Sequence, residues 1–220
     1  NYIMKIDANT VSVLKNFAKI NPSIVVQEGN TLKTISPNKT IMAKANVTTN
    51  FGKRFAIYNL DRFLSTLSLF NDPELNFGER AVVISDNNKT TNYTYADEAT
   101  VAKAPEKELN LPSVDVSFRL TNDNLKDVEK AAAVLALPEI VVSGDGSKVY
   151  LQAADTKNPS GDIYSIAIGE TDKTFKAIFK SENIKIIPGD YDVNICSRGI
   201  SLFKGAEAEY WIAVESHSTF

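Results

Sequence analysis

Two lysines with helical spacing are the residues of this chain whose chemistry is easiest to predict. Lys15 and Lys19 stand four residues apart, and on a helix of 100° per residue they share one arc with Ser12 and Asn16. No acidic residue lies on that arc. A row of ammonium groups attracts phosphates without reading bases, so the arc predicts non-specific binding to DNA. The alternative is a solvated helix face that binds nothing.

The sequence offers little for catalysis. Its only cysteine, Cys196, and its only histidine, His217, are too few for a zinc site, and they give no Ser-His-Asp or Cys-His set beyond chance. No phosphate-binding loop or dinucleotide fingerprint occurs, and the acids Asp97 and Glu98 fit a solvated loop better than a general acid and base. We predict a protein that binds rather than converts, without cofactor or metal. A hydrolase built from carboxylates alone is a weaker alternative.

The lysine arc belongs to a helix predicted over residues 7–20, inside a strand–helix–strand segment at 5–28. Asp7 is a good N-cap residue, and Pro22 ends the helix. The side opposite the lysines is apolar and predicts packing against a sheet; it comprises Val11, Val13, Leu14, Phe17, Ala18 and Ile20. This helix therefore has a core face and a cationic face.

The same order of elements occurs a second time. Thr121 takes the N-cap place of Asp7 at the start of another helix, and Pro138 follows that helix as Pro22 follows the first. This alignment also matches four apolar positions of the two helices: Val11 with Leu125, Leu14 with Val128, Phe17 with Ala131 and Ala18 with Ala132. The strand residues at 24–26 recur at 140–142. Glu129 and Ala133 then occupy the places of Lys15 and Lys19, so the second half should attract DNA less than the first.

A second matching block supports a duplicated domain. Residues 55–58 match 176–179, and short helices are predicted after them at 60–69 and 181–186. In the first of these helices Leu60, Phe63, Leu64 and Leu67 should point inward. The outward arcs of the other three predicted helices add further candidate DNA-facing residues. These are Arg62, Ser65 and Thr66 on the second helix, Lys126 and Lys130 on the third, and Lys180 and Lys185 at the fourth. Glu129 and Ala133 share the arc of the third helix.

Strands fill the sequence between the helices. Turn residues separate runs that predict strands at 2–6, 23–27, 32–36, 41–46, 54–58, 74–77, 81–85, 90–95, 115–120, 139–143, 148–154, 162–169, 174–179, 191–196, 200–204 and 210–216. The segment 96–112 has two prolines and no sustained period, which predicts a connector. The predicted fold class is α+β, with antiparallel sheets and helices gathered on one face, in two similar domains at 1–95 and 113–220.

Composition and charge limit the kinds of partner. The chain is 43% hydrophobic and 23% charged, as in ordinary globular proteins, and no apolar run approaches the roughly 18 residues of a membrane span. We therefore expect no membrane partner. Residues 1–110 hold 13 Lys and Arg against 11 Asp and Glu, whereas residues 111–220 hold 11 against 16, for a total of −3. Such a chain would not hold DNA tightly as an open monomer.

Several stretches resemble the sliding clamps of T-even-type bacteriophages. They are TVSVLKNFAKIN at 10–21, FAIYNLDRFLSTLSLFND at 55–72, PGDY at 188–191 and EYWIAVESHSTF at 209–220. The resemblance covers nearly the whole chain, although residues 90–112 depart from it. It implies the DNA-clamp fold in a homotrimeric ring, with the helices on the inner face around duplex DNA.

The resemblance also implies partners. A clamp loader would open the ring, and the ring would tether the replicative DNA polymerase for processive synthesis and contact late-transcription proteins, in the cytoplasm of the infected bacterial host. Closure would use the edge strands at 90–95 and 162–169. A polymerase peptide would dock between the domains near the connector, where the candidates are Val101, Pro105, Leu109, Leu111, Tyr210 and Ile212. These six residues fit ordinary packing equally well.

A different class of protein is the main alternative. A β-rich virion or adhesion protein without enzymatic activity would explain the strands rich in Asn and Thr and the missing catalytic groups. It would not explain duplicated helices with lysines on one arc.

Overall fold

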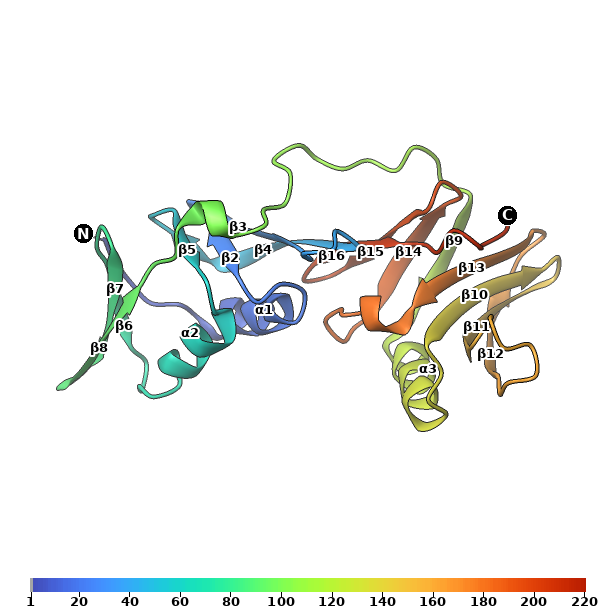
Figure 1. The fold of residues 1–220 in the computed structure, drawn as a ribbon, viewed down its shortest axis with the longest axis horizontal. Coiled ribbons are helices and arrows are strands. Elements are labelled where there is room, and N and C mark those ends of the chain that lie inside the picture. The colour runs from blue at the N-terminus through green and yellow to red at the C-terminus, as the bar shows by residue number, and fades with distance from the viewer. Residues whose placement is uncertain (1) are drawn as a thin grey trace. The chain divides into compact units, whose positions relative to one another are not determined.

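The structure, a computed structural model, describes residues 2–220 of the chain. The chain divides into two compact units, the first ending at Lys107 and the second comprising Glu108–Phe220. The boundary falls inside the segment 96–112 that the sequence predicts as a connector. Each unit combines helices with antiparallel strands (Figure 1), which agrees with the predicted α+β class.

Among its described residues, the first unit holds two α-helices and eight strands. Its strands are β1 (Tyr2–Met4), β2 (Ile24–Val26), β3 (Gly29–Ile35), β4 (Ile41–Phe51), β5 (Phe55–Ile57), β6 (Glu74–Phe77), β7 (Ala81–Asp86) and β8 (Lys89–Thr94). They form a sheet in the order β1-β6-β7-β8 and the pairs β2-β5 and β3-β4, all antiparallel. Helices α1 (Ala8–Ala18) and α2 (Leu60–Leu67) lie beside each other, and α1 also packs on β4.

Helix α1 begins where the sequence predicts. The backbone N–H of Thr10 donates to Asp7 Oδ1 at 2.9 Å, which satisfies one of the free donors of the first turn. Thr10 is itself buried and joins the helix to β4, since its hydroxyl bonds that of Thr49 at 2.8 Å. Burial acts to raise the pKa of Asp7, but hydrogen bonds from Thr48 and Thr10 outweigh it and hold this pKa below its usual value.

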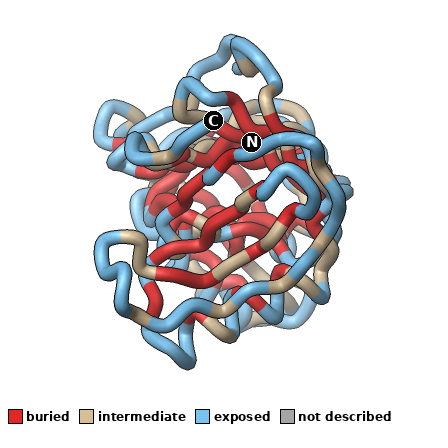
Figure 2. The backbone as a smooth tube through the Cα atoms, turned by 90° about the vertical axis from the view of Figure 1, so that its right-hand side faces the viewer, coloured by how far each residue is buried: buried red, intermediate tan, exposed pale blue. Residues whose placement is uncertain are grey.

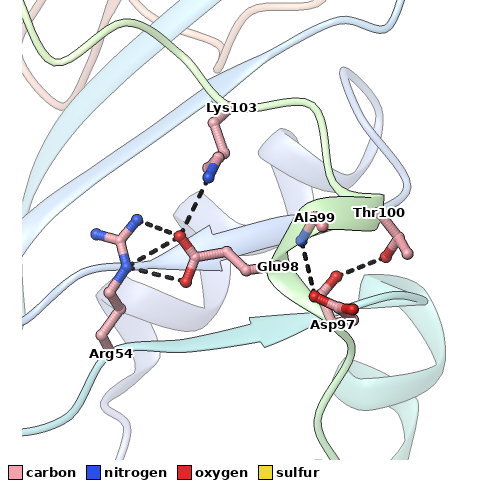
Figure 3. Close-up of polar contacts among 6 residues, drawn as sticks. All are labelled: Arg54, Asp97, Glu98, Ala99, Thr100 and Lys103. Atoms are coloured by element: carbon pink, nitrogen blue, oxygen red, sulfur yellow. Dashed lines mark hydrogen bonds and ion pairs between the residues drawn. The ribbon is translucent and has the colours of Figure 1, made fainter.

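The first part of the predicted connector is fixed to the first unit. Ala96 N donates to Ala56 O at 2.9 Å, and Val101 is buried. Between them, residues Glu98–Thr100 form the 3-10 turn η1, whose N–H at Ala99 is capped by Asp97 Oδ1 at 3.0 Å. Glu98 accepts from Arg54 Nε at 3.0 and 3.1 Å and from Lys103 Nζ at 3.2 Å (Figure 3). The stretch is an ordered strap rather than a free linker.

This strap should respond to acid. Hydrogen bonds from Arg54 lower the pKa of Glu98 from 4.5 to about 2. A lowered pKa means that the contact stabilises the strap fully above pH 4.5 and is lost as the pH falls toward 2. In an NMR titration the carboxyl carbon of Glu98 should titrate near 2, and in Arg54→Ala it should return toward 4.5. As a control, substituting the exposed Arg80 by Ala should leave the pKa of Glu98 at its wild-type value. A pKa of Glu98 near 4.5 in the wild-type protein would contradict the contact with Arg54.

The second unit holds one α-helix and eight strands. Its strands are β9 (Val116–Leu120), β10 (Glu139–Asp145), β11 (Lys148–Ala154), β12 (Tyr164–Glu170), β13 (Thr174–Lys180), β14 (Tyr191–Cys196), β15 (Ile200–Gly205) and β16 (Glu209–Ala213). They form antiparallel sheets in the orders β12-β11-β10-β13 and β16-β15-β14-β9. Helix α3 (Asn122–Val134) packs on β10, β11 and β12, and buried residues follow the strands while the connecting loops are exposed (Figure 2).

The C-terminal residues cover the free edge of β13. Glu215 N donates to Ile178 O at 2.7 Å, and Lys176 and Thr219 exchange two backbone hydrogen bonds at 2.8 and 2.9 Å. His217 Nε2 lies 3.3 Å from a carboxylate oxygen of buried Glu139. The tail therefore closes one side of this sheet.

The two units repeat the same local connection. Pro22 O accepts from Leu60 N at 2.8 Å in the first unit, and Pro138 O accepts from Ser181 N at 2.9 Å in the second. In both, the residue donating is the first of a helical turn after a strand. The second-unit turn is the 3-10 helix η2 (Ser181–Asn183), shorter than the helix predicted at 181–186.

The strand ladders are shifted by one residue from the predicted alignment of the repeats, whereas the connections from Pro22 and Pro138 keep that alignment. The ladders place Ile57 opposite Ile24 and Phe179 opposite Ile140, so Phe55 corresponds to Ala177 rather than to Lys176. In the helices, the buried positions Leu125, Val128 and Ala132 have the spacing of Thr10, Val13 and Phe17 in α1. The N-caps Asp7 and Thr121 keep the predicted alignment, so the buried faces of α1 (11 residues) and α3 (13 residues) differ in phase by one residue because each face is set by the sheet beneath its helix.

Candidate nucleic-acid interface

Helix α1 presents an exposed cationic stripe. Ser12, Lys15 and Lys19, at spacings of three and four residues, are all exposed, as the wheel predicts. Asn16 is not: it is 8% exposed, and the expectation that it stands on the open arc is wrong. A helical wheel gives the direction of a side chain but not what other elements cover it. Within residues 2–220, neither lysine forms an ion pair.

Lys15 also lines a groove between α1 and α2. The groove has a volume of about 400 Å³, and its walls include Val11, Leu64 and Asp61. Lys15 lies in the last turn of α1, where its ammonium group interacts favourably with the negative end of the helix dipole and stabilises the helix. The carboxylate of Asp61 reduces the positive potential at this end of the stripe. Lys15 thus has a structural role beside its predicted role toward phosphate.

Helix α2 adds one exposed cation. Arg62 is exposed, and its backbone N–H donates to the N-cap Asn59 Oδ1 at 3.0 Å. The predicted inward residues Leu60, Phe63, Leu64 and Leu67 are all buried, which confirms the orientation of this helix. Burial raises the pKa of nearby Tyr93, and the charge of Arg62 opposes that shift.

The exposed face of α3 is mixed in charge. Lys126 and Lys130 are exposed, but so are Asp123, Asp127 and Glu129 on the same helix. By the burial spacing it is Lys130, not Glu129, that takes the place of Lys15. The expectation that the second unit attracts DNA less than the first nevertheless agrees with three acids against two lysines on α3.

The last two candidate cations lie at the end of β13 and after η2. Lys180 is exposed, with its Nζ 3.9 Å from Glu215 of the C-terminal tail. Lys185 is exposed as well. Whether DNA lies against any of these groups stays a prediction.

Three of the six residues predicted to line the peptide pocket are buried. Tyr210 and Ile212 are fully buried, and Val101 is 6% exposed, so packing within the units accounts for these three side chains. Tyr210 belongs to the core of the second unit, where its hydroxyl accepts from Ile187 N at 3.1 Å and its ring lies 6.0 Å from that of Tyr191. Burial raises the pKa of Tyr210 to about 12. Pro105 and Leu109 are exposed and Leu111 is half-buried, and their role stays a prediction.

Both strands predicted to close a ring are edge strands. Among the strands that residues 2–220 form, β8 pairs only with β7 and β12 only with β11, each at the end of a four-stranded sheet. In both strands half-buried residues alternate with exposed ones. An open edge of this kind can accept another strand.

Residues 2–220 show neither a cluster of metal-ligating side chains nor a membrane-spanning helix. That part of the chain contains no group of three or more His, Cys, Asp or Glu side chains placed to hold a metal ion. None of its helices has the length and apolar character needed to cross a membrane.

Comparison with known proteins assigns the family. A model of DNA polymerase processivity factors matches residues 6–104, and a model of the gp45 sliding clamp, C-terminal part, matches residues 117–216. The sliding clamp of Vibrio phage KVP40 is 37% identical over 221 residues, which is 97% of this chain and 100% of the relative. The chain belongs to the sliding-clamp family. The sliding clamp of enterobacteria phage T4 is 30% identical over 98% of this chain and 99% of its own length.

Solved clamp structures share the fold. PCNA from Thermococcus kodakaraensis superimposes with a TM-score of 0.70 at 20% identity, over 98% of this chain and 100% of that one. The β clamp of Helicobacter pylori gives 0.71 at 12% identity, over 97% of this chain and 66% of that one. This sliding clamp therefore has the DNA-clamp fold, and its family is that of DNA polymerase processivity factors rather than of virion or adhesion proteins.

Proposed function

We propose that this clamp closes into a ring of three copies around duplex DNA and tethers the replicative polymerase. The exposed stripe of Ser12, Lys15 and Lys19 carries the proposal, since it is cationic and holds no group suited to reading bases. Two such lysines per copy would attract phosphates from several sides of the duplex at once.

Enclosure explains how an acidic protein can work on DNA. The chain carries a net charge of −3, so a single copy has little electrostatic affinity for the duplex. A closed ring is held by its topology instead, and weak contacts let it slide. The mixed charge on α3 fits this mechanism better than a uniformly basic surface would.

The remaining partners follow from the resemblance to T-even clamps. We propose that a clamp loader opens the ring, that the ring has no catalytic activity of its own, and that it acts in the cytoplasm of an infected bacterium. The same loaded ring would serve as a co-activator of late transcription. Loader-dependent stimulation of transcripts from a late promoter would test that second role.

Retention on circular DNA tests the proposal directly. Clamp loaded by its cognate loader onto nicked circular DNA should stay bound through a salt wash, and cutting the circle should release it. The same clamp should lengthen the products of its polymerase in primer extension. Equal retention on circular and linear DNA would contradict enclosure, because a gripping protein does not need a closed template.

A further inference from the structure

The C-terminal tail, residues 215–220, is the counterpart of the strap in the first unit. Ala96 N donates to Ala56 O where the strap begins, and Glu215 N donates to Ile178 O where the tail begins. The strand ladders make Ala56 equivalent to Ile178. Both units therefore lay a segment of chain along the corresponding strand, β5 in the first unit and β13 in the second.

The tail differs from the strap in having no buried anchor. Val101 of the strap is buried, whereas none of the side chains at 215–220 is, and Phe220 is 46% exposed. Segments with few buried apolar contacts open locally at a small fraction of the free energy of global unfolding. The tail should therefore leave β13 while the rest of the second unit stays folded.

A buried carboxylate lies beneath the tail. Glu139 of β10 is 5% exposed, and its Oε1 accepts from the N–H and the hydroxyl of Thr156 at 2.6 and 2.7 Å. His217 reaches across β13 to this pair, with Nε2 3.3 Å from Glu139 Oε2 and 2.9 Å from Thr156 Oγ1. Burial acts to raise the pKa of Glu139, but the bonds from Thr156 and the charge of His217 outweigh it and hold this pKa below its usual value.

The same face of the sheet carries a small apolar cluster. Val141 lies two residues beyond Glu139 in β10 and therefore shares its face. Val141 is opposite Ile178 in the ladder, and both form a buried cluster with Ala154. A segment that replaced the tail would meet apolar side chains beside a carboxylate.

We propose that the tail masks a site where an extended peptide of a partner protein adds a strand to β13. Lys176 and Thr219 already exchange two backbone hydrogen bonds in antiparallel register. Ile178 N instead donates to a side chain, Ser218 Oγ, at 2.9 Å, because the tail turns where Ser218 N donates to Glu215 O. An extended peptide would bond Ile178 through its backbone as well, and such bonds supply the affinity of strand addition.

The tail itself indicates the side chains that the peptide needs. Glu215 Oε1 lies 3.9 Å from Lys180 Nζ, and His217 lies against Glu139 two positions later. The partner peptide should carry an acidic residue and, two residues after it, a basic one. The basic residue matters more, because Glu139 is buried and a buried charge without a partner is costly. Lys180 is exposed, so its ion pair contributes little.

Amide hydrogen exchange in the wild-type protein tests the release of the tail. Alternate residues of an antiparallel strand direct their N–H groups to opposite sides, so Lys176 and Ile178 face the tail while Ala177 and Phe179 face β10. Lys176 and Ile178 should have protection factors lower by about ten-fold or more, since local opening exposes them. Equal protection of the four amides would overturn the release.

Two serines of the tail provide a matched pair of variants. Ser218→Ala removes the acceptor of Ile178 N and should lower the protection of Ile178 about two- to twelve-fold, the range for one hydrogen bond. Ser216→Ala changes an exposed serine of the same segment and should leave that protection unchanged. Equal effects of the two substitutions would also count against the proposed contacts of the tail.

Peptide binding to a clamp shortened by residues 215–220 tests the site itself. A synthetic peptide with the sequence of residues 214–220 should shift the amide signals of Lys176 and Ile178 saturably. The same peptide with His217→Arg should bind as well or better, and with His217→Glu it should not saturate. No saturable shift with any peptide, or equal binding of the Arg and Glu peptides, would overturn the site.

Two features keep this test decisive. If the shortened chain does not fold, the full-length Ser218→Ala protein, whose tail is loosened, should bind the same peptides in the same order. Both measurements use the clamp alone, without DNA or polymerase. Their failure would therefore leave the proposed ring and the tethering of the polymerase standing, and loss of processive synthesis would leave the strand-addition site standing.

Discussion

Reversing Lys15 and Lys19 to Glu together should sharply reduce the processivity of synthesis while leaving the assembled clamp intact. Both side chains are exposed and form no ion pair within residues 2–220, so the folded chain loses little beyond the interaction of Lys15 with the helix dipole. A trimer would lose six cations from its inner face and gain six anions. If all six lysines contact phosphate, the slope of log affinity against log salt should fall by about 5.

The measurement is primer extension and retention on nicked circular DNA over a series of salt concentrations. The control is Lys39→Glu with Lys157→Glu, which makes the same change in net charge at two exposed turn positions. Sedimentation should report the same assembly for wild type and both variants. Normal product lengths for the α1 variant at moderate salt would contradict a role of these lysines toward DNA.

Substitutions at Tyr210 and Ile212 should destabilise the second unit rather than weaken the binding of a partner selectively. Ile212 is fully buried, and Ile212→Ala should lower the free energy of unfolding by about 2–5 kcal/mol through lost burial and a cavity. Tyr210→Phe removes the acceptor of the buried Ile187 N–H and should cost about 1–3 kcal/mol.

Chemical denaturation measures both changes. The control is Ile163→Ala, because Ile163 is 62% exposed and its truncation should change stability by at most about 0.5 kcal/mol. If the Tyr210→Phe variant had wild-type stability but bound the polymerase weakly, Tyr210 would have to contact the partner, and this prediction would be wrong.

Local chemistry carried much of the fold prediction. The N-caps Asp7 and Thr121 both accept a hydrogen bond from the third helical residue, because a carboxylate or hydroxyl at that position meets the free N–H groups of the first turn. Each run predicted as a strand overlaps a strand of the structure, since alternation and turn residues are properties of a few neighbouring positions. The inward residues of α2 followed from helical periodicity in the same way.

Packing decided what local pattern could not. Asn16 shares the arc of Lys15 on a wheel, yet it is buried, and no count along one helix reveals a neighbour that covers it. The strap around Glu98 has no period, and it is ordered by Arg54, a residue 44 positions earlier in the chain.

The sequence by itself determined the family, the order of elements, the duplication and the positive stripe at Lys15 and Lys19. Each depends on residue types at fixed short spacings, or on similarity along the chain. Only the tertiary structure decided the one-residue shift between the repeats, the burial of Tyr210 and Ile212, and the open edges of β8 and β12. These depend on which distant segments meet, because burial and strand pairing are properties of contacts between elements rather than of any single element.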